Sequence, residues 1–460
     1  MSYRDLSFWW DTLPDELAGP VREPLRGSTT ADVVVVGAGY TGLWTAYYLA
    51  VADPSLRVVV LEAETAGFGA SGRNGGWASA LFPTSLAKVA ASSSRQAAVS
   101  LLEAMFDTVD EVGRVAETEG IDCHYRKGGS VVLARTPLQL QRAREEVEDK
   151  RSWGFGPEHF ALLTADEARE RLGATDVLGA TYTPHCASIN PARLVRGLAL
   201  AAERRGVTIH ERTRVTSIEA GVVRTERGDV RAPRIVRATE AWTSQLPGYE
   251  REIAPVYSLV MATEPLPASV WDEIGLRHGE TFSDHRHLII YGQRTADDRF
   301  VFGGRGAPYH FGSRIRPEFD REPAVFAALQ GVLRELFPAV ARHAVTHTWG
   351  GPIGIPRDWY PSVGLDATTG IGWAGGYVGD GVASSNLAGR TLADLLRGVA
   401  SERTALPWVN RRSPRWEPEP LRWLGVNLGL RVMGSADGAE QRSGKPARRA
   451  EILAPLLGGH

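Results

Sequence analysis

The chain has 460 residues, of which 43% are hydrophobic, and a formal net charge of −2 at pH 7. A chain of this length can bury a large core and is expected to form two domains, and its balanced charge gives no indication of a polyanion as partner. No stretch approaches the about 18 to 20 apolar residues of a membrane span and residues 1–5 show no leader pattern, so we expect a cytoplasmic protein.

The first predicted elements form a dinucleotide-binding unit. Residues 1–30 are expected to be an arm that lies over the domain surface. The four valines at 33–36 predict a buried strand that turns into a helix over 43–52, with Gly37, Gly39 and Gly42 on the GxGxxG spacing. A second apolar strand, 58–61, ends in Glu62, whose carboxylate can accept hydrogen bonds from a ribose diol. Together the two strands, the glycines, the helix and Glu62 predict a bound dinucleotide. The alternative is a glycine-rich turn that holds no ligand. These features do not distinguish a nicotinamide cofactor from a flavin.

The middle of the chain departs from this pattern twice. After a loop of small residues at 66–77, a helix is expected over 86–119, a strand over 129–133 and a helix over 137–151, which indicates an inserted domain. Asn190 and Pro191 supply an N-cap and a first helical position, so the nucleotide domain is expected to resume there with a helix to about Arg205. Further expected strands lie at 207–209, 213–218, 222–226 and 230–239, then in a second inserted block at 256–263, 288–291 and 300–304, with a helix at 323–337.

A late glycine-rich loop, 370–381, opens a predicted helix over 382–397. Its exposed amides and the positive end of the helix dipole favour the negative charge that a reduced flavin carries near N1 and O2. Taken alone, the loop is also compatible with a connection that holds no ligand. Paired with the turn at 37–42, it indicates the second end of a flavin. Asp380 at the helix entry is expected to act as an N-cap and to point away from the ring.

Five segments carry a family resemblance: residues 69–76, 237–242, 302–305, 376–383 and 386–390. They resemble the D-amino-acid oxidase-like family of FAD-dependent oxidoreductases, and closely its gamma-glutamylputrescine oxidase branch, over most of residues 30 to 400. The resemblance implies an α/β and α+β protein, in which a Rossmann-like FAD-binding domain is interleaved with a substrate domain built on a large mixed or antiparallel sheet. We expect the FAD-binding domain at 31–80, 185–250 and 349–400, the substrate domain at 81–184 and 251–348, and a C-terminal tail at 401–460.

The resemblance also assigns residues to an extended FAD. It implies that Gly37, Gly39 and Gly42 hold the pyrophosphate, Glu62 the ribose, and the backbone of Val215 the adenine. Arg73, Asn74, Gly75 and Gly76 would lie along the edge of the flavin, and Gly379, Gly381 and Val382 at its pyrimidine end. The other expected cofactor contacts are Tyr40, Thr41, Ala63, Gly69, Ser71, Trp77, Thr239, Trp242 and Gly376.

The attachment of FAD is expected to be noncovalent. Some relatives bind it through a late Cys or through a His beside the first flavin loop, but no Cys follows Cys186 and the loop reads Gly75, Gly76, Trp77. The other cysteine, Cys123, lies far from Cys186 without ligand spacing, so neither a disulfide framework nor a metal site is predicted.

The family chemistry removes a hydride from the carbon next to an amine nitrogen, giving an imine that water hydrolyses, so no nucleophile is needed. The expected reactants are a primary or secondary amine, such as a polyamine derivative or an amino acid, and dioxygen, a quinone or a carrier protein as acceptor. Arg305 is expected to pair with a substrate carboxylate or in a structural ion pair. The candidates for the substrate pocket, each also compatible with a packed core residue, are Trp77, Tyr257, Tyr291, Arg305, Trp349 and Tyr377.

Three other interpretations stay open. One is a biosynthetic flavin enzyme that oxidises an unusual amine with an acceptor other than oxygen. The others are a tRNA-modifying domain, disfavoured because the chain has no dense basic run in its core, and a noncatalytic FAD-binding scaffold.

Residues 414–432 have helical apolar spacing with basic flanks, and are expected to pack on the FAD domain, on a second subunit of a homodimer, or on a membrane surface. The chain is expected to end in a disordered stretch.

Overall fold

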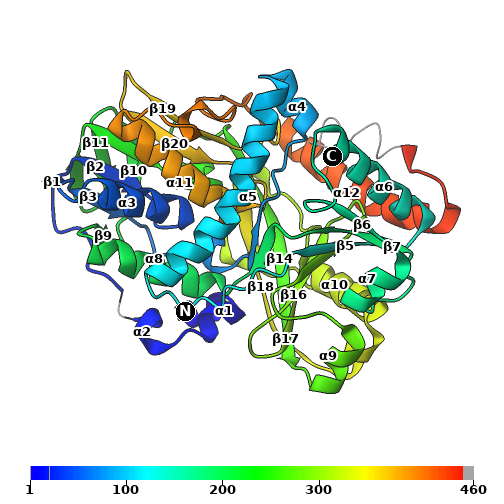
Figure 1. The fold of residues 1–460 in the computed structure, drawn as a ribbon. Coiled ribbons are helices and arrows are strands. Elements are labelled where there is room, and N and C mark those ends of the chain that lie inside the picture. The colour runs from blue at the N-terminus through cyan, green and yellow to red at the C-terminus, as the bar shows by residue number, and fades with distance from the viewer. Residues whose placement is uncertain (1, 20, 449–460) are drawn as a thin grey trace.

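The computed structural model describes residues 2–19 and 21–448, and it shows a mixed α/β protein built on two large sheets (Figure 1). The predicted fold class is confirmed. The expected disordered end falls at residues 449–460, which lie outside the described part of the chain. None of the helices in that part combines the length and the apolar character that a membrane span requires.

The first sheet has six strands in the order β19-β20-β13-β2-β3-β9, all parallel except β19. Both of its faces are covered, which is why the four valines of β2 are all buried. Val33 and Val35 face a cluster formed with the helices, while Val34 and Val36 face the four-stranded sheet β1-β12-β11-β10. The strands are β1 (Thr29–Thr30), β2 (Val33–Val36), β3 (Val58–Leu61), β9 (Thr208–His210), β10 (Val215–Glu219), β11 (Val222–Thr225), β12 (Gly228–Arg231), β13 (Arg234–Arg237), β19 (Ser362–Asp366) and β20 (Ile371–Gly375).

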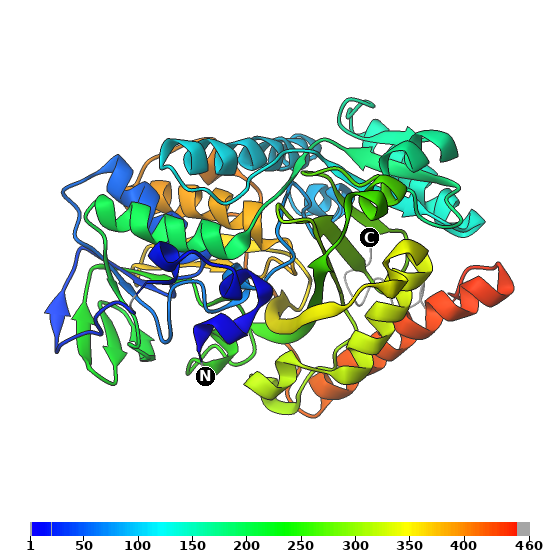
Figure 2. The same cartoon turned by 90° about the horizontal axis from the view of Figure 1, so that it is seen from below.

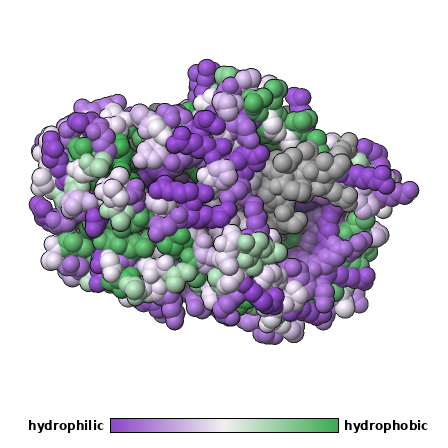
Figure 3. Space-filling model, turned by 90° about the horizontal axis from the view of Figure 1, so that it is seen from above, coloured by the Kyte–Doolittle hydropathy of each residue, from purple (hydrophilic) through white to green (hydrophobic). Residues whose placement is uncertain are grey.

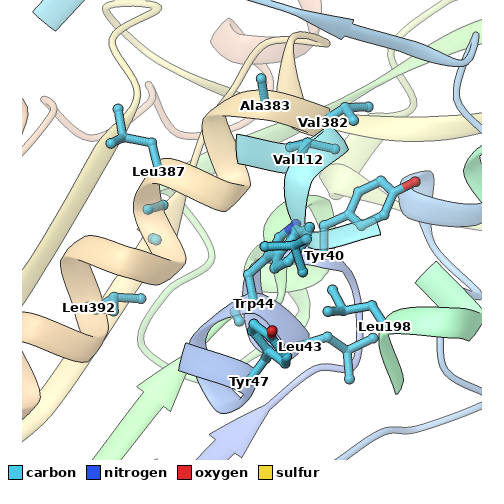
Figure 4. Close-up of a cluster of buried hydrophobic side chains, with 14 of the residues drawn as sticks. Tyr40, Leu43, Trp44, Tyr47, Val112, Leu198, Val382, Ala383, Leu387 and Leu392 are labelled. Atoms are coloured by element: carbon cyan, nitrogen blue, oxygen red, sulfur yellow. The ribbon is translucent and has the colours of Figure 1, made fainter. Parts of the chain in front are cut away.

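Helix α3 (Tyr40–Ala52) lies at the centre of the helical layer on this sheet. Its Leu43 and Trp44 pack with α5 (Arg95–Thr118), α8 (Pro191–Arg204) and α11 (Gly381–Arg397), as the side chains in Figure 4 show. A Cβ at Gly389 would lie 2.6 Å from Cβ of Trp44, so only glycine lets the α11 backbone approach α3 this closely. The two helices that begin at the two glycine-rich turns are therefore packed directly together.

The second sheet has eight strands in the order β18-β14-β17-β16-β15-β5-β7-β6, antiparallel except for the β15 and β5 pair. Its strands are β5 (Ser130–Ala134), β6 (Ala161–Leu163), β7 (Gly179–Thr183), β14 (Ile253–Pro265), β15 (Thr281–Asp284), β16 (Ile290–Arg294), β17 (Arg299–Gly304) and β18 (Val345–Pro356). The pair β4 (Trp77–Ser79) and β8 (Cys186–Ser188) is separate. The helices of this half are α6 (Pro137–Ser152), α7 (Ala165–Arg171), α9 (Ala268–Ile274) and α10 (Pro323–Leu336), whereas α4 (Leu86–Ala91) packs in the cluster of the first sheet and its helices.

Three expectations differ from the structure. The last FAD-binding segment was expected to start at residue 349, but β18 pairs with β14 as far as Pro356, so we propose a boundary after 356. The helix expected over 86–119 is two helices, because Ser94 caps a new one, α5, after α4 has ended. The strand expected over 230–239 is interrupted between β12 and β13, where Pro233 cannot donate to a ladder.

One short part of the N-terminal arm, residues 7–10 and 13, is buried, while most of the described arm lies at the surface as expected. Phe8, Trp9 and Trp10 of α1 (Phe8–Asp11), which is followed by α2 (Asp15–Ala18), pack with residues of β14, β17 and β18. Seen from below, the arm lies between the two halves of the molecule (Figure 2). The tail adds one long helix, α12 (Leu421–Ser443), at the edge of the molecule. On the face seen from above, polar side chains predominate and apolar ones gather in separate areas (Figure 3).

Candidate active site

The site is formed where the parallel strands β2, β13 and β20 end at the same edge of the six-stranded sheet. Ligands of such sheets bind outside the carboxyl ends of the strands. The turns that follow β2 and β20 meet there: Thr41, at the start of α3, hydrogen-bonds Tyr377, before α11, at 2.9 Å across 336 residues of sequence. The turn after β13 joins them, since a Cβ at Gly37 would lie 2.5 Å from the Ala238 carbonyl oxygen.

Glycine is required in the first turn. Gly37 has φ +105°, and a Cβ at Gly42 would lie 1.9 Å from the Gly37 carbonyl oxygen. Gly39 is the N-cap of α3 and gives it no side-chain cap, and Asp380 makes no capping hydrogen bond at α11. By contrast, side chains cap all five helices from α4 to α8. The N-termini at both turns thus keep free amides and a positive dipole end for an anionic ligand.

Glu62 lies beside the first turn. Its carboxylate accepts hydrogen bonds from the amides of Ala38 (2.8 Å) and Glu64 (3.0 Å), and burial raises its pKa to about 7. The Thr213 amide donates to the Glu62 carbonyl at 2.8 Å, which brings Val215, at the start of β10, to the same end of the sheet. Ala63 follows Glu62 in the turn that leaves β3. These residues form a group that fits the adenosine end of a dinucleotide.

The small-residue loop at 69–77 is held on both sides. Ser71 Oγ accepts a hydrogen bond from the Tyr40 amide at 2.8 Å, and the Asn74 side chain bonds the Ala70, Ser71 and Gly76 backbone. Arg73 is buried, pairs with Asp320 at 2.7 Å and donates to the Gly350 carbonyl at 3.1 Å. Arg73 thus ties the loop to the eight-stranded sheet, and this role was not foreseen from the sequence.

The end of this loop lies under the second sheet. A Cβ at Gly75 would lie 2.5 Å from the Tyr291 ring, and one at Gly76 would lie 2.0 Å from Gln293 Nε2. The Trp77 and Tyr291 rings meet edge to face with centroids 6.0 Å apart, and the Tyr291 hydroxyl bonds Ser258 at 2.9 Å. Two of the expected substrate aromatics therefore share one wall beside the loop.

Arg305 lies near Tyr291 and near Asp380. Arg305 donates to the Val378 carbonyl at 2.6 Å and stacks over the Trp359 ring. Burial raises the pKa of Asp380 to about 7 against the opposing effect of the Arg305 charge. Burial also lowers the pKa of Arg305, while the Asp380 charge raises it. A guanidinium group and a carboxyl group that titrates near neutral pH thus lie at the start of α11.

Glu240 was missed by the sequence analysis as a separate site residue. It follows β13 with φ +42°, and its carboxylate accepts hydrogen bonds from the amides of Gly354 (2.6 Å), Gly376 (3.2 Å) and Tyr377 (3.4 Å). Burial raises its pKa, although these amides oppose the shift. Its position shortly after β13 does not by itself mark it among other carboxylates that follow strands. Thr239 and Trp242 flank it, and a Cβ at Gly69 would lie 3.0 Å from the Trp242 ring.

Three expected pocket residues are packed in the protein interior. Trp349 is buried, and its indole donates to the Arg73 carbonyl at 2.8 Å. Tyr257 is buried in the core of the second sheet, where its hydroxyl accepts a hydrogen bond from the Arg316 amide. Tyr377 is buried against α3 through Thr41. We therefore propose that Trp349 and Tyr377 position the two flavin loops rather than contact a substrate.

Comparison with known proteins identifies the family. The family of FAD-dependent oxidoreductases described as DAO matches residues 32–395. The chain belongs to this family. It is 32% identical to the gamma-glutamylputrescine oxidoreductase of Escherichia coli over 82% of this chain and 86% of that protein. It is 29% identical to a probable oxidoreductase, OrdL, of Haemophilus influenzae over 85% of this chain and 88% of that protein. Glycine oxidase from Geobacillus kaustophilus has the same fold, with a TM-score of 0.71 and 23% identity over 84% of this chain and 99% of that structure.

The resemblance stated from the sequence is confirmed, and FAD is the cofactor of this oxidoreductase. The residues present fit it. Two uncapped helix N-termini and glycines without room for a side chain lie between a buried carboxylate at one end and an aromatic wall at the other. The individual contacts of each residue with FAD remain predictions.

Proposed function

We propose that this protein oxidises the bond between carbon and nitrogen of a primary or secondary amine. Bound FAD supplies the redox chemistry by accepting a hydride from the carbon next to the nitrogen, and the resulting imine is hydrolysed by water. The similarity to gamma-glutamylputrescine oxidoreductase supports an amine as substrate. The observation that carries the proposal is the meeting of the two turns at Thr41 and Tyr377, with the Trp77 and Tyr291 wall beside them.

The protein's own part in this reaction is to bind and orient the amine. Trp77 and Tyr291 present aromatic surfaces that exclude water and favour an amine or its cation. Hydride removal requires the neutral amine, so rates are expected to rise with pH as the bound ammonium loses its proton. No nucleophilic side chain is needed for this chemistry.

Arg305 and Asp380 support a substrate with further charged groups. The Arg305 guanidinium can pair with a substrate carboxylate. The Asp380 carboxylate makes no hydrogen bond to a side-chain or backbone donor among the described residues, and Arg305 is the charge that acts on it. An amino-acid group carries both a carboxylate and an ammonium, so we propose gamma-glutamyl conjugates of diamines as the first substrates to test, followed by free polyamines and amino acids.

Anaerobic mixing of the FAD-loaded protein with each amine tests the proposal. We expect at least one compound among polyamines, their gamma-glutamyl conjugates, N-methyl amino acids and D-amino acids to bleach the visible band of oxidised flavin. Hydrogen peroxide formed in air would identify dioxygen as the acceptor, whereas reoxidation only by an added quinone would identify a dehydrogenase. A flavin that stays oxidised with every amine contradicts the proposal and supports a noncatalytic scaffold.

A further inference from the structure

Helix α12 is attached to the protein by its polar side, which is the reverse of an ordinary surface helix. Asp437 accepts hydrogen bonds from the amides of His287 (2.8 Å) and Leu288 (3.0 Å), and Glu440 binds Arg142 and His287. A helix that packs on a core normally turns its apolar stripe inward. Here ion pairs and hydrogen bonds anchor the helix together with one apolar contact, that of Val426 with the cluster around Tyr309 and Trp416. The three groups His287, Asp437 and Glu440 lie within 4.8 Å of one another, and backbone amides and Arg142 occupy their oxygens.

The anchoring continues toward the start of the helix. Arg422 is buried and donates to the Glu250 carbonyl at 3.0 Å. The Asn427 side chain accepts a hydrogen bond from the Tyr309 amide at 3.1 Å and donates to its carbonyl at 3.0 Å. Gly429 and Ala436 complete the buried side. These contacts fix which side of α12 faces the protein and therefore which side faces outward.

The outward stripe is apolar in its first half and basic in its second. Leu421, Leu424 and Leu428 are 59%, 52% and 59% exposed, and they recur at the helical spacing of one face. Arg431 and Arg442 continue the same face, are exposed, and form no ion pair among the described residues. Both carboxylates of the helix, Asp437 and Glu440, point inward. Figure 2 shows α12, drawn in red, at the edge of the molecule.

We propose that this face of α12 docks the protein on the surface of an anionic lipid bilayer. Leucines that enter the interface and arginines that reach lipid phosphates are the two components of such binding. A second copy fits less well, because both carboxylates of α12 point inward, so the same face of a partner helix offers the exposed arginines no carboxylate. The helix lies on the membrane in this proposal and does not cross it.

Vesicle flotation of the full-length, FAD-loaded protein tests the proposal. We expect flotation with vesicles of phosphatidylcholine and phosphatidylglycerol, little flotation with phosphatidylcholine alone, and weaker binding at high salt. Combined Leu421→Gln, Leu424→Gln and Leu428→Gln should lower the partition coefficient at least about tenfold. The matched control is Leu162→Gln with Leu178→Gln, two leucines that are 37% and 39% exposed outside α12, and it should float like the unchanged protein.

Substitution of the two arginines tests the charge component of binding, and analytical ultracentrifugation tests the alternative of a second copy. Arg431→Gln with Arg442→Gln should reduce binding to anionic vesicles and weaken its salt dependence. Unchanged protein that fails to float with anionic vesicles, or a triple leucine variant that floats normally, overturns the proposal. So does a dimer in analytical ultracentrifugation that the triple leucine variant converts to a monomer, because a second copy would then cover this face.

Discussion

Replacing Glu62 by Gln should weaken FAD binding without unfolding the protein. The carboxylate already receives amides from Ala38 and Glu64, and its remaining lone pairs are proposed to accept the ribose diol. Hydrogen bonds to a charged group contribute about 1.5 to 3 kcal/mol. Because 1.4 kcal/mol corresponds to a factor of ten, the Kd for FAD should rise about 10-fold to 100-fold.

The pKa of Glu62 gives this prediction a second readout. Burial raises it to about 7, so the carboxyl group is largely protonated at pH 6 and ionised at pH 8. FAD binding that uses the ionised form should therefore strengthen as pH rises through 7, and Glu62→Gln should lose this dependence. The raised pKa also means that the apoprotein loses stability from this group as pH rises from about 4.5 through 7.

Fluorescence titration of the apoprotein with FAD at pH 6, 7 and 8 measures both effects. Glu64→Gln is the matched control, since its side chain pairs with Arg214 and the Tyr3 hydroxyl and should leave the Kd unchanged. The reasoning is refuted if Glu62→Gln binds FAD as tightly as the unchanged protein, or if its Kd varies with pH in the same way.

Four further outcomes are expected. Gly42→Ala should cost about 3 kcal/mol or more of stability and yield protein without visible flavin absorbance, because its Cβ would meet the Gly37 oxygen. In contrast, a Cβ at Gly331 would have no atom within 4 Å, so Gly331→Ala should raise the midpoint of thermal unfolding slightly. Equal melting curves for the Gly42→Ala and Gly331→Ala variants would contradict this account. In the unchanged protein, KM for a cationic substrate should fall as pH rises through 7, because the Asp380 carboxyl group ionises there. Asp380→Asn should remove this fall and raise KM at pH 8. An unaltered KM profile would rule out a contact between Asp380 and the substrate. Acid precipitation should release all FAD into the supernatant, and a yellow pellet would indicate a covalent bond.

The elements of the FAD-binding half could be predicted from local sequence patterns. Four successive valines indicate a strand covered on both faces, and β2 is such a strand. Asn190 and Pro191 predicted the start of α8 to the residue, because capping chemistry is encoded within a few positions. Breaks between consecutive helices were harder to predict. Ser94 lies within a stretch of helical apolar spacing, where the local sequence does not distinguish an N-cap from a residue inside one continuous helix.

The rest of the site depends on which distant loops meet. Nothing local distinguishes Glu240, which bonds amides more than a hundred residues away, from any other carboxylate after a strand. Trp349 was an aromatic on a strand near the flavin, but the face on which it lies follows from the pairing of β18 with β14. The burial of α1 was missed because Trp9 and Trp10 show no periodicity in so short a segment, and their partners lie on distant strands.

A crystal structure of the protein with FAD would test the central claim most directly. The account predicts one FAD molecule with its pyrophosphate at the N-terminus of α3, its ribose on Glu62, and its ring between the loop at 69–77 and the start of α11. Density for FAD that bypasses either glycine-rich turn, or a ring that lies away from Tyr291 and Trp77, would contradict it.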